Sequence, residues 1–331
     1  MNIHQSATPI LIVVVPLITS FVLPILGWWN RRLVFPVSIF ALSCSFGLAL
    51  VLARRVLNTG PVQYFMGGWE PPWGIAFHID HLAVLMLLLL TFVTLLVGIY
   101  SKKSIVKEVP DQEVPFYSVY LILASGLTGL VSTADMFNLY VFLEITSLSC
   151  YALVSLGGGV AVVSAFRYVI LGTVGAAFYL LSVGYLYSVT GSLNMADLAN
   201  LLPSLYESNA VLVGFAFFVI GISLKMALFP MHAWLPGAYS NAPSAVSALV
   251  AGTTTKVAAY VLVRVMFFVF EPSFSIDTLP VTTVLSWMAA IAMILGSVMA
   301  IAQSDLKRML AYSSVAQIGY IVLGIGLANE M

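Results

Sequence analysis

Charge is what this chain has least of. Only 8% of its 331 residues are charged, whereas a soluble domain carries roughly 25%. Two cysteines and four histidines are present, with no CxxC pair and no block of basic residues. The shortage of charge excludes an ordinary soluble domain, and the lack of basic blocks argues against nucleic-acid binding. Cys44 and Cys150 both lie in apolar stretches, so neither a disulfide nor a zinc site is expected there.

Long apolar stretches take the place of the missing charge. The chain is 61% hydrophobic, with a mean hydropathy of +1.05. Because a membrane-spanning helix needs about 20 apolar residues, we predict an all-α polytopic membrane protein with about ten spans. The first span lacks a basic leader and an obvious cleavage site, so we expect it to be retained. The predicted spans are 8–27, 33–53, 79–100, 115–133, 136–156, 162–188, 210–228, 243–269, 281–302 and 309–328.

The lysines and arginines between the spans predict the topology. If the amino terminus faces outward, most basic residues in the connections fall on the inward side, as the positive-inside rule requires. Both termini are therefore expected to face outward. The outward connection after the second span, GPVQYFMGGWEPPWGIAFHIDH, is rich in glycine, proline and aromatic residues. We expect it to form a short hairpin, with Trp69 and Trp73 at headgroup level.

Three ionisable residues lie inside long apolar stretches of the chain. Glu144 stands in NLYVFLEITSLSCYALV, Lys225 in VLVGFAFFVIGISLKMALF and Lys256 in SAVSALVAGTTTKVAAYVLV. A charge near the bilayer centre costs at least about 2.5 kcal/mol, so it persists mainly beside a partner or a wet cavity. Tyr260 shares a helix face with Lys256, one turn further on. One acid and two amines inside three of the spans predict a protein that handles protons or ions inside the membrane.

The segment after Lys225 is predicted to break its helix. In LKMALFPMHAWLPGAYSNAPSAVSAL, Pro230, Pro236 and Pro243 follow closely, and proline removes a backbone donor and clashes with the preceding turn. Discontinuous helices of this kind mark transport sites in many carriers. The alternative is that the prolines end the helix at the inner surface, where Lys225 would snorkel. His232 is either a proton relay or a structural hydrogen-bonding residue.

Other polar signals favour structural roles. His78, Asp80 and His81 lack a fourth ligand, so no metal site is expected and Asp80 is interpreted as a helix cap. The glycine run 157–159 lacks the lysine of a phosphate loop. Asp135 precedes the fifth span and is interpreted as a cap, with the opening of an outer proton path as the alternative.

Charges near the later spans are interpreted as anchors. Arg264 is expected to snorkel towards the outer surface. Asp305, Lys307 and Arg308 flank an inward turn, where they are expected to fix the topology, with a part in the proton path as the alternative.

These residues carry a resemblance to a known family. The segments LKMALFPMHAWLPGAYSNAPSAVSALVAGTTTKVAAYVLVR, DMFNLYVFLEI and AQSDLKRMLAYSSVAQIGYI resemble the antiporter-like membrane subunits. That family includes the pumping subunits of complex I, the Mrp antiporter protein of the D type and relatives in membrane-bound hydrogenases and sulfur-reducing complexes. The sequences of these motifs are most similar to those of the Mrp D and hydrogenase type. The resemblance implies the plasma membrane of a prokaryote.

The resemblance also implies roles for individual residues. Glu144 matches the glutamate that pairs with a lysine and modulates it. Lys225 matches the lysine of the broken helix, where pumping is switched, and His232 matches the histidine that follows it. Lys256 matches the residue that passes the proton onward.

The resemblance further implies an arrangement of repeats. The family fold has about fourteen helices, built on two inverted five-helix repeats. This chain would then contain an N-terminal region (1–114), a complete first repeat with a broken seventh helix (115–269) and an incomplete second repeat (270–331). A counterpart of the later lysine or glutamate, and of the long lateral helix, is missing, and Gln317 stands where some relatives carry a histidine. We expect either a separate chain that supplies the remainder or a shortened product.

Two functions follow as hypotheses. The first is a proton-translocating subunit, with sodium as the alternative coupling ion, in an Mrp-type antiporter or a redox-driven pump. The second is a non-conducting structural or assembly subunit. Other membrane subunits, protons and lipid are the expected partners. No cofactor is expected, and any enzymatic activity would belong to the complex, because no haem, flavin or iron–sulfur ligand set is visible.

Overall fold

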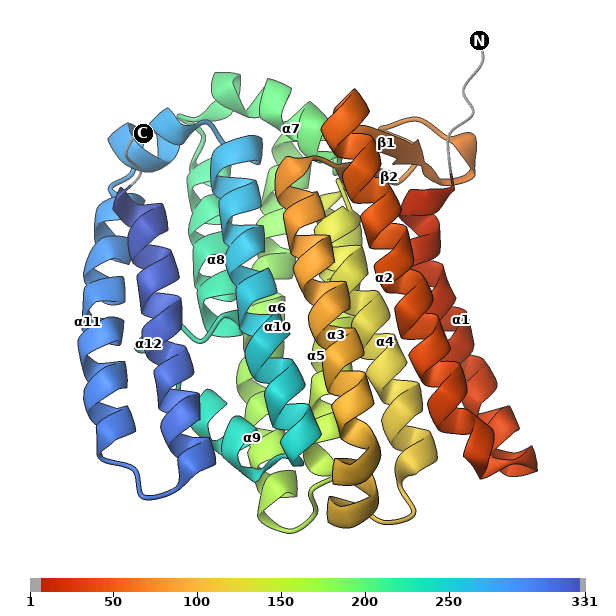
Figure 1. Ribbon diagram of the computed structural model, residues 1–331. Helices are drawn as coiled ribbons and strands as arrows, with labels where there is room; N and C mark the ends of the chain where they lie inside the picture. Colours follow the sequence, from red (N-terminus) through yellow and green to blue (C-terminus); the bar gives the residue numbers. More distant parts are fainter. Residues whose placement is uncertain (1–6, 328–331) are drawn as a thin grey trace. The chain divides into compact units, whose positions relative to one another are not determined.

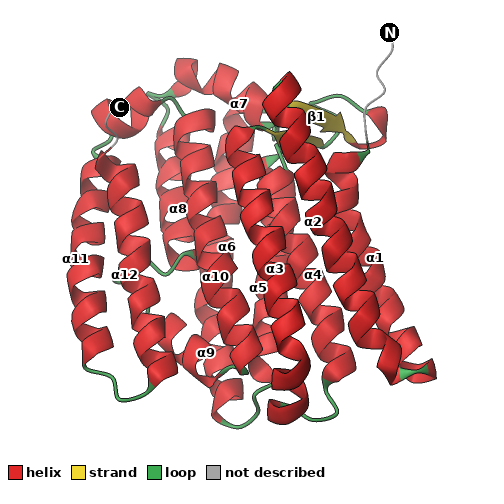
Figure 2. Cartoon of the chain, viewed as in Figure 1, coloured by secondary structure: helices red, strands yellow, loops and turns green. Residues whose placement is uncertain are grey.

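The computed structural model describes residues 7–327, and these fold almost entirely into helices (Figures 1 and 2). In this part of the chain, nine helices are long and apolar enough to cross a membrane, and the shorter apolar helix α8 is a tenth. The prediction of an all-α polytopic membrane protein is confirmed. The ten helices are α1 (Thr8–Trp29), α2 (Val34–Thr59), α3 (His81–Glu108), α4 (Glu113–Ser132), α5 (Met136–Ser155), α6 (Val160–Thr190), α8 (Asn209–Lys225), α10 (Ser244–Arg264), α11 (Val281–Ile301) and α12 (Leu306–Leu327).

The helices belong to two compact units. Unit 1 comprises Met1–Val162 and Ala242–Thr253, and unit 2 comprises Val163–Asn241 and Thr254–Met331. The first half of α10 belongs to unit 1, and the half that carries Lys256 belongs to unit 2. The predicted repeat boundaries at residues 114 and 269 stay a prediction.

In unit 1, the most buried helix is α4, which packs against α1, α3 and α5. Its glycines allow close approach between helices: a Cβ at Gly126 would lie 2.6 Å from the hydroxyl of Thr146 on α5. Small residues at helix contacts are the usual packing device in membranes. The core of unit 1 therefore forms around α4.

The connection between α2 and α3 forms the predicted hairpin. Strands β1 (Val62–Phe65) and β2 (Ala76–Ile79) pair antiparallel. Trp69 and Trp73 are in the loop that connects the two strands, with 69% and 88% of their surface exposed. The hairpin prediction is confirmed.

The predicted caps are also present. The Asp80 side chain accepts a hydrogen bond from the backbone N–H of Ala83 (2.9 Å) at the start of α3. Asp135 accepts one from the N–H of Asn138 (2.7 Å) at the start of α5. Each satisfies a donor that the first turn of a helix leaves unpaired.

Unit 2 contains most of α6, the short helix α7 (Met195–Leu201), α8, the short helix α9 (Leu235–Asn241), the second half of α10, and α11 with α12. Helices α11 and α12 pack as a hairpin. Contact is close at glycines: a Cβ at Gly296 would lie 2.8 Å from the backbone nitrogen of Ala316, and one at Gly319 would lie 2.9 Å from the carbonyl oxygen of Ala289. Helix–helix contacts in this unit thus also depend on glycine.

Candidate functional site

Helix α8 ends at Lys225 within buried surroundings. Ala227 has a positive φ of 58°, and the N–H groups of Ala227 and Leu228 donate to the carbonyls of Leu224 (3.2 Å) and Ser223 (3.0 Å). This pair of bonds is a Schellman motif, with alanine where glycine is usual. Met226, Ala227 and Leu228 are each fully buried. The predicted helix break is confirmed, and the chain leaves the helix before it reaches Pro230.

The end of α8 gives Lys225 a polar backbone environment. The indole N–H of Trp234 donates to the carbonyl of Leu224 (3.1 Å), which also accepts from Ala227. A helix C-terminus carries roughly half an elementary negative charge. A half-buried ammonium at the last position of the helix is therefore stabilised by the helix itself. Because the helix ends here, its partially negative C-terminus lies beside Lys225, which an unbroken span would not provide.

Helix α6 packs against α8 beside this lysine. A Cβ at Gly221 would lie 2.7 Å from the carbonyl oxygen of Gly175 and 2.9 Å from the backbone nitrogen of Tyr179, and one at Gly175 would lie 3.6 Å from Cγ of Lys225. Both glycines are needed because the two backbones approach so closely. The stem of Lys225 is thus held against α6.

The chain after the break is held by aromatic stacking and hydrogen bonds within unit 2. The rings of Trp234 and Tyr168, which is on α6, stack with centroids 4.0 Å apart and planes 4° from parallel. Asn241 donates from its side-chain amide to the hydroxyl of Ser164 (2.8 Å). Contacts to two parts of α6 fix the turn and α9 in place.

The prolines have different positions in this segment. Pro230 is exposed in the turn, and Pro236 is buried in the first turn of α9, where its missing N–H leaves no gap in the helix. Pro243 comes directly before α10. Prolines therefore shape the segment after the break, while the Schellman motif ends α8.

His232 lies in the turn, with its ring near two aromatic rings. Its centroid is 5.3 Å from that of Phe229 and 6.5 Å from that of Tyr312 on α12. Its Nδ1 is buried and has no hydrogen-bond partner among residues 7–327. Both alternatives for His232, the proton relay and the structural hydrogen bond, stay predictions.

Lys256 lies in the middle of a continuous helix. It is half-buried on α10, Tyr260 follows one turn later and is buried, and Thr254 shares a hydroxyl–hydroxyl contact of 3.4 Å with Tyr239 on α9. The backbone around Lys256 is used by the helix. Any polar environment for this ammonium has to come from side chains or water.

Arg264 differs from its prediction. It is only 6% exposed, and its guanidinium carbon lies 5.7 Å from the ring centroid of Tyr260 and 4.9 Å from that of Phe268. The expectation that it snorkels to the outer surface is wrong. The guanidinium lies over the rings of Tyr260, one turn before, and Phe268, one turn after, and these cation–π contacts stabilise it in its buried position. The chain continues from Arg264 into a π-helical turn, Val265–Val269.

Two acids of unit 1 were predicted to take part in proton transfer, Glu144 and Asp135. Glu144 is half-buried on α5. Asp135 is buried, and burial raises the pKa of its carboxyl, while the N–H groups of Asn138 and Phe137 oppose that rise. The pairing of Glu144 with Lys225 and an outer proton path at Asp135 stay predictions.

Asp305 and Lys307 lie at the turn between α11 and α12. Asp305 is exposed and accepts a hydrogen bond from the N–H of Arg308 (2.7 Å), while Lys307 is half-buried. Asp305 is thus a cap of α12.

Three features near Lys225 were not predicted from sequence. These are the left-handed Ala227, the carbonyl capped by Trp234, and the Gly175–Gly221 contact. Only the last has a local signal, because glycine inside an apolar span commonly marks a close helix contact. The first two depend on tertiary surroundings.

Comparison with known proteins gives consistent results. Residues 133–331 match the family described as NADH:quinone oxidoreductase/Mrp antiporter, transmembrane part, and residues 72–103 match the family described as the N-terminus of chain 5 of NADH-ubiquinone oxidoreductase (complex I). The chain is 47% identical over 98% of its length to the N-type subunit of NADH-quinone oxidoreductase from Desulforudis audaxviator. It is 31% identical over 97% of its length to the D-type subunit of the Na(+)/H(+) antiporter from Alkalihalophilus pseudofirmus.

A solved structure shows the same fold. A chain in the membrane-bound sulfane sulfur reductase, an archaeal respiratory membrane complex, matches 97% of this chain with a TM-score of 0.91 and 32% identity. This chain spans 64% of the length of each of the two relatives and 65% of the matched chain in that structure.

Proposed function

Because the chain belongs to the NADH:quinone oxidoreductase/Mrp antiporter family, we propose that it translocates protons across a membrane as one subunit of a larger complex. The relatives are subunits of a quinone oxidoreductase and of a sodium/proton antiporter, and the matched structure is a respiratory membrane complex. Other membrane subunits are thus the proposed partners. The family resemblance supports an Mrp-type antiporter or a redox-driven pump as the host complex.

The single observation that carries the proposal is the end of α8 at Lys225. A helix that stops at an amine, among fully buried residues, places an exchangeable proton beside a helix C-terminus. Helix ends inside the membrane form the ion and substrate sites of many transporters. An amine also changes its proton occupancy readily when its surroundings change, which suits a switch.

The proposed path uses four residues of this chain. Glu144 acts as the modulating charge: when it is close to Lys225 it favours the protonated amine, and when it is separated, burial favours release of the proton. Lys225 is the switch, His232 is the relay in the turn, and Lys256 carries the proton onward. A change in a neighbouring subunit would drive the switch by moving charge or backbone near Glu144.

Protons are proposed over sodium because of the side chains in the path. Two amines and an imidazole bind and release protons, whereas hard cations prefer oxygen ligands. Sodium transport in the whole complex would then be coupled through another part of it.

The test is proton flux in the complete complex. Lys225→Gln removes the exchangeable proton and keeps most of the side-chain length. We expect proton movement in reconstituted vesicles, followed with a pH-sensitive dye, to fall at least about tenfold, since a positioned proton carrier contributes on the order of 10² or more to a transfer rate. Complex yield should not change.

A matched control is Lys103→Gln, at an exposed lysine near the end of α3, which should transport at the wild-type rate. If the Lys225→Gln complex assembles and still moves protons at the wild-type rate, the proposal is wrong. That outcome favours the second hypothesis, a structural or assembly subunit that conducts nothing.

A further inference from the structure

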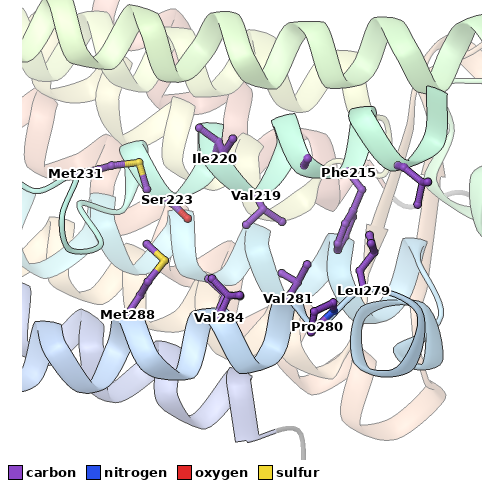
Figure 3. A pocket seen from close by; sticks show the side chains of 13 residues that line it. Phe215, Val219, Ile220, Ser223, Met231, Leu279, Pro280, Val281, Val284 and Met288 are labelled. Carbon is purple, nitrogen blue, oxygen red and sulfur yellow. The ribbon is translucent and has the colours of Figure 1, made fainter. Parts of the chain in front are cut away.

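A cavity of about 370 Å³ lies between α8 and α11 in unit 2 (Figure 3). Its lining is apolar, with the hydroxyl of Ser223 as the single polar side chain among the lining residues. Four of these residues are also exposed: Ala216, Ile220 (39%), Pro280 and Val284 (53%). The cavity is therefore open along the exposed side of α8 and α11.

The cavity runs along the helices. At one end lie Phe215 and Pro280, near the starts of α8 and α11, and at the other lie Ser223, Met231 and Met288, beside the break (Figure 3). From Leu212 to Ser223 the rise along α8 is about 16 Å at 1.5 Å per residue. Half of a hydrocarbon core of roughly 30 Å is about 15 Å. The cavity thus has the depth of one leaflet.

The chemistry of the lining differs from that of the helix contacts. Where α8 packs on α6, it presents Gly214 and Gly221, and the backbones are close. Where α11 packs on α12, glycines again allow contact. None of the thirteen residues that line the cavity is glycine, and most are bulky and apolar. Small residues mark helix–helix interfaces in membranes, so this surface is suited to a flexible hydrocarbon rather than to another helix.

We propose that the α8–α11 cavity binds one acyl chain of a membrane phospholipid, whose methyl end reaches the break in α8. The headgroup then lies at the end of unit 2 where α8 and α11 begin. The acyl chain fills the space beside Ser223 and Met231, two residues on either side of the break at Lys225. It keeps this side of the break free of water. The site does not depend on which ion the complex moves.

The test uses phosphatidylcholine with a photoreactive diazirine in one acyl chain, in vesicles that contain the assembled complex. After illumination, adducts are mapped by peptide mass spectrometry. A diazirine near the ester should label Leu279 and Val281, and a diazirine near the methyl end should label Met231 and Met288. Trp287, which is 69% exposed and does not line the cavity, reports bulk lipid.

Two variants on α8 provide the matched comparison. Val219→Phe puts a ring into the cavity, and labelling of Met288 should fall at least about threefold because the ring takes the space of the acyl chain. Val213→Phe makes the same change at an exposed position outside the lining and should leave the labelling of Met288 unchanged.

Either of two results overturns the proposal. One is labelling of Trp287 without labelling of Met231 and Met288 in the wild-type complex, which means that a protein segment fills or closes the cavity. The other is equal labelling of Met288 in both variants. Which residues each diazirine position labels is measured in the wild-type complex. The test therefore holds even if Val219→Phe fails to assemble.

Discussion

The two half-buried lysines, Lys225 and Lys256, lie in contrasting backbone environments. Lys225 is the last residue of α8, beside carbonyls at a helix end, whereas Lys256 lies within α10, which continues for two more turns to Arg264. Each lysine follows a glycine by four residues, in GISLK and GTTTK. The local sequences are similar, yet the backbone stabilises a cation at one position and not at the other. The difference comes from the turn that follows Lys225.

The glycines before the two lysines should respond very differently to substitution. Gly221→Ala places a Cβ 2.7 Å from the backbone oxygen of Gly175, which cannot move aside without displacing α6. We expect a loss of stability of about 2–3 kcal/mol, in the range of overpacked cores. The measurement is the midpoint temperature for thermal dissociation of the purified complex in detergent.

The matched control is Gly252→Ala on α10. Its Cβ would lie 3.2 Å from a single side-chain methyl of Val93, which can yield, and alanine favours the helix by up to about 1 kcal/mol. No loss of stability is expected. Equal destabilisation by the two changes would contradict the proposed difference between the helices.

A substitution at Ala227, the left-handed residue after α8, tests whether the turn accounts for the difference between α8 and α10. Ala227 has a φ of 58°, a conformation that costs an L-residue roughly 1–2 kcal/mol and costs glycine almost nothing. Ala227→Gly should therefore raise the midpoint temperature of the complex, by about 1 kcal/mol in stability, with proton flux unchanged. A lower midpoint would mean that the Schellman motif does not end α8. Ala258→Gly, within α10, is the control and should destabilise by about 1 kcal/mol.

Removal of the indole cap of α8 should have an effect of similar size to that of Ala227→Gly. Trp234→Phe removes the hydrogen bond to the carbonyl of Leu224 and keeps an aromatic ring opposite Tyr168. We expect a loss of about 1 kcal/mol, typical for one hydrogen bond. The control is Trp73→Phe, the same change at an indole that is 88% exposed, and it should be nearly neutral. If the two changes cost the same, the indole N–H does not support the helix end.

Much of the fold could be predicted because its signals are local. Asp80 and Asp135 precede helices and cap them, and the glycine- and proline-rich connection forms a hairpin with Trp69 and Trp73 between its strands. Each depends on residues within a few positions in sequence. The clustered prolines likewise predicted that the helix carrying Lys225 is broken.

The features that escaped prediction depend on distant residues. An alanine rarely adopts a positive φ, so Ala227 gives no signal, and Trp234 caps a carbonyl ten residues earlier. Arg264 is buried because Tyr260 and Phe268 offer their ring faces, an arrangement that the position of the arginine alone did not indicate. The α8–α11 cavity also depends on how two helices pack. Sequence reasoning therefore located the candidate site but not its environment.

The most direct test of the central claim is proton flux in the Lys225→Arg complex. Arginine keeps a positive charge at the end of α8 but does not release its proton, so it separates the charge from the proton transfer. With Lys103→Arg as the control and assembly unchanged, we predict a loss of about 100-fold in proton flux through reconstituted vesicles, within the usual range for removal of a proton-transfer group. Flux at the wild-type rate in the Lys225→Arg complex would contradict the account, because Lys225 would then supply only a charge.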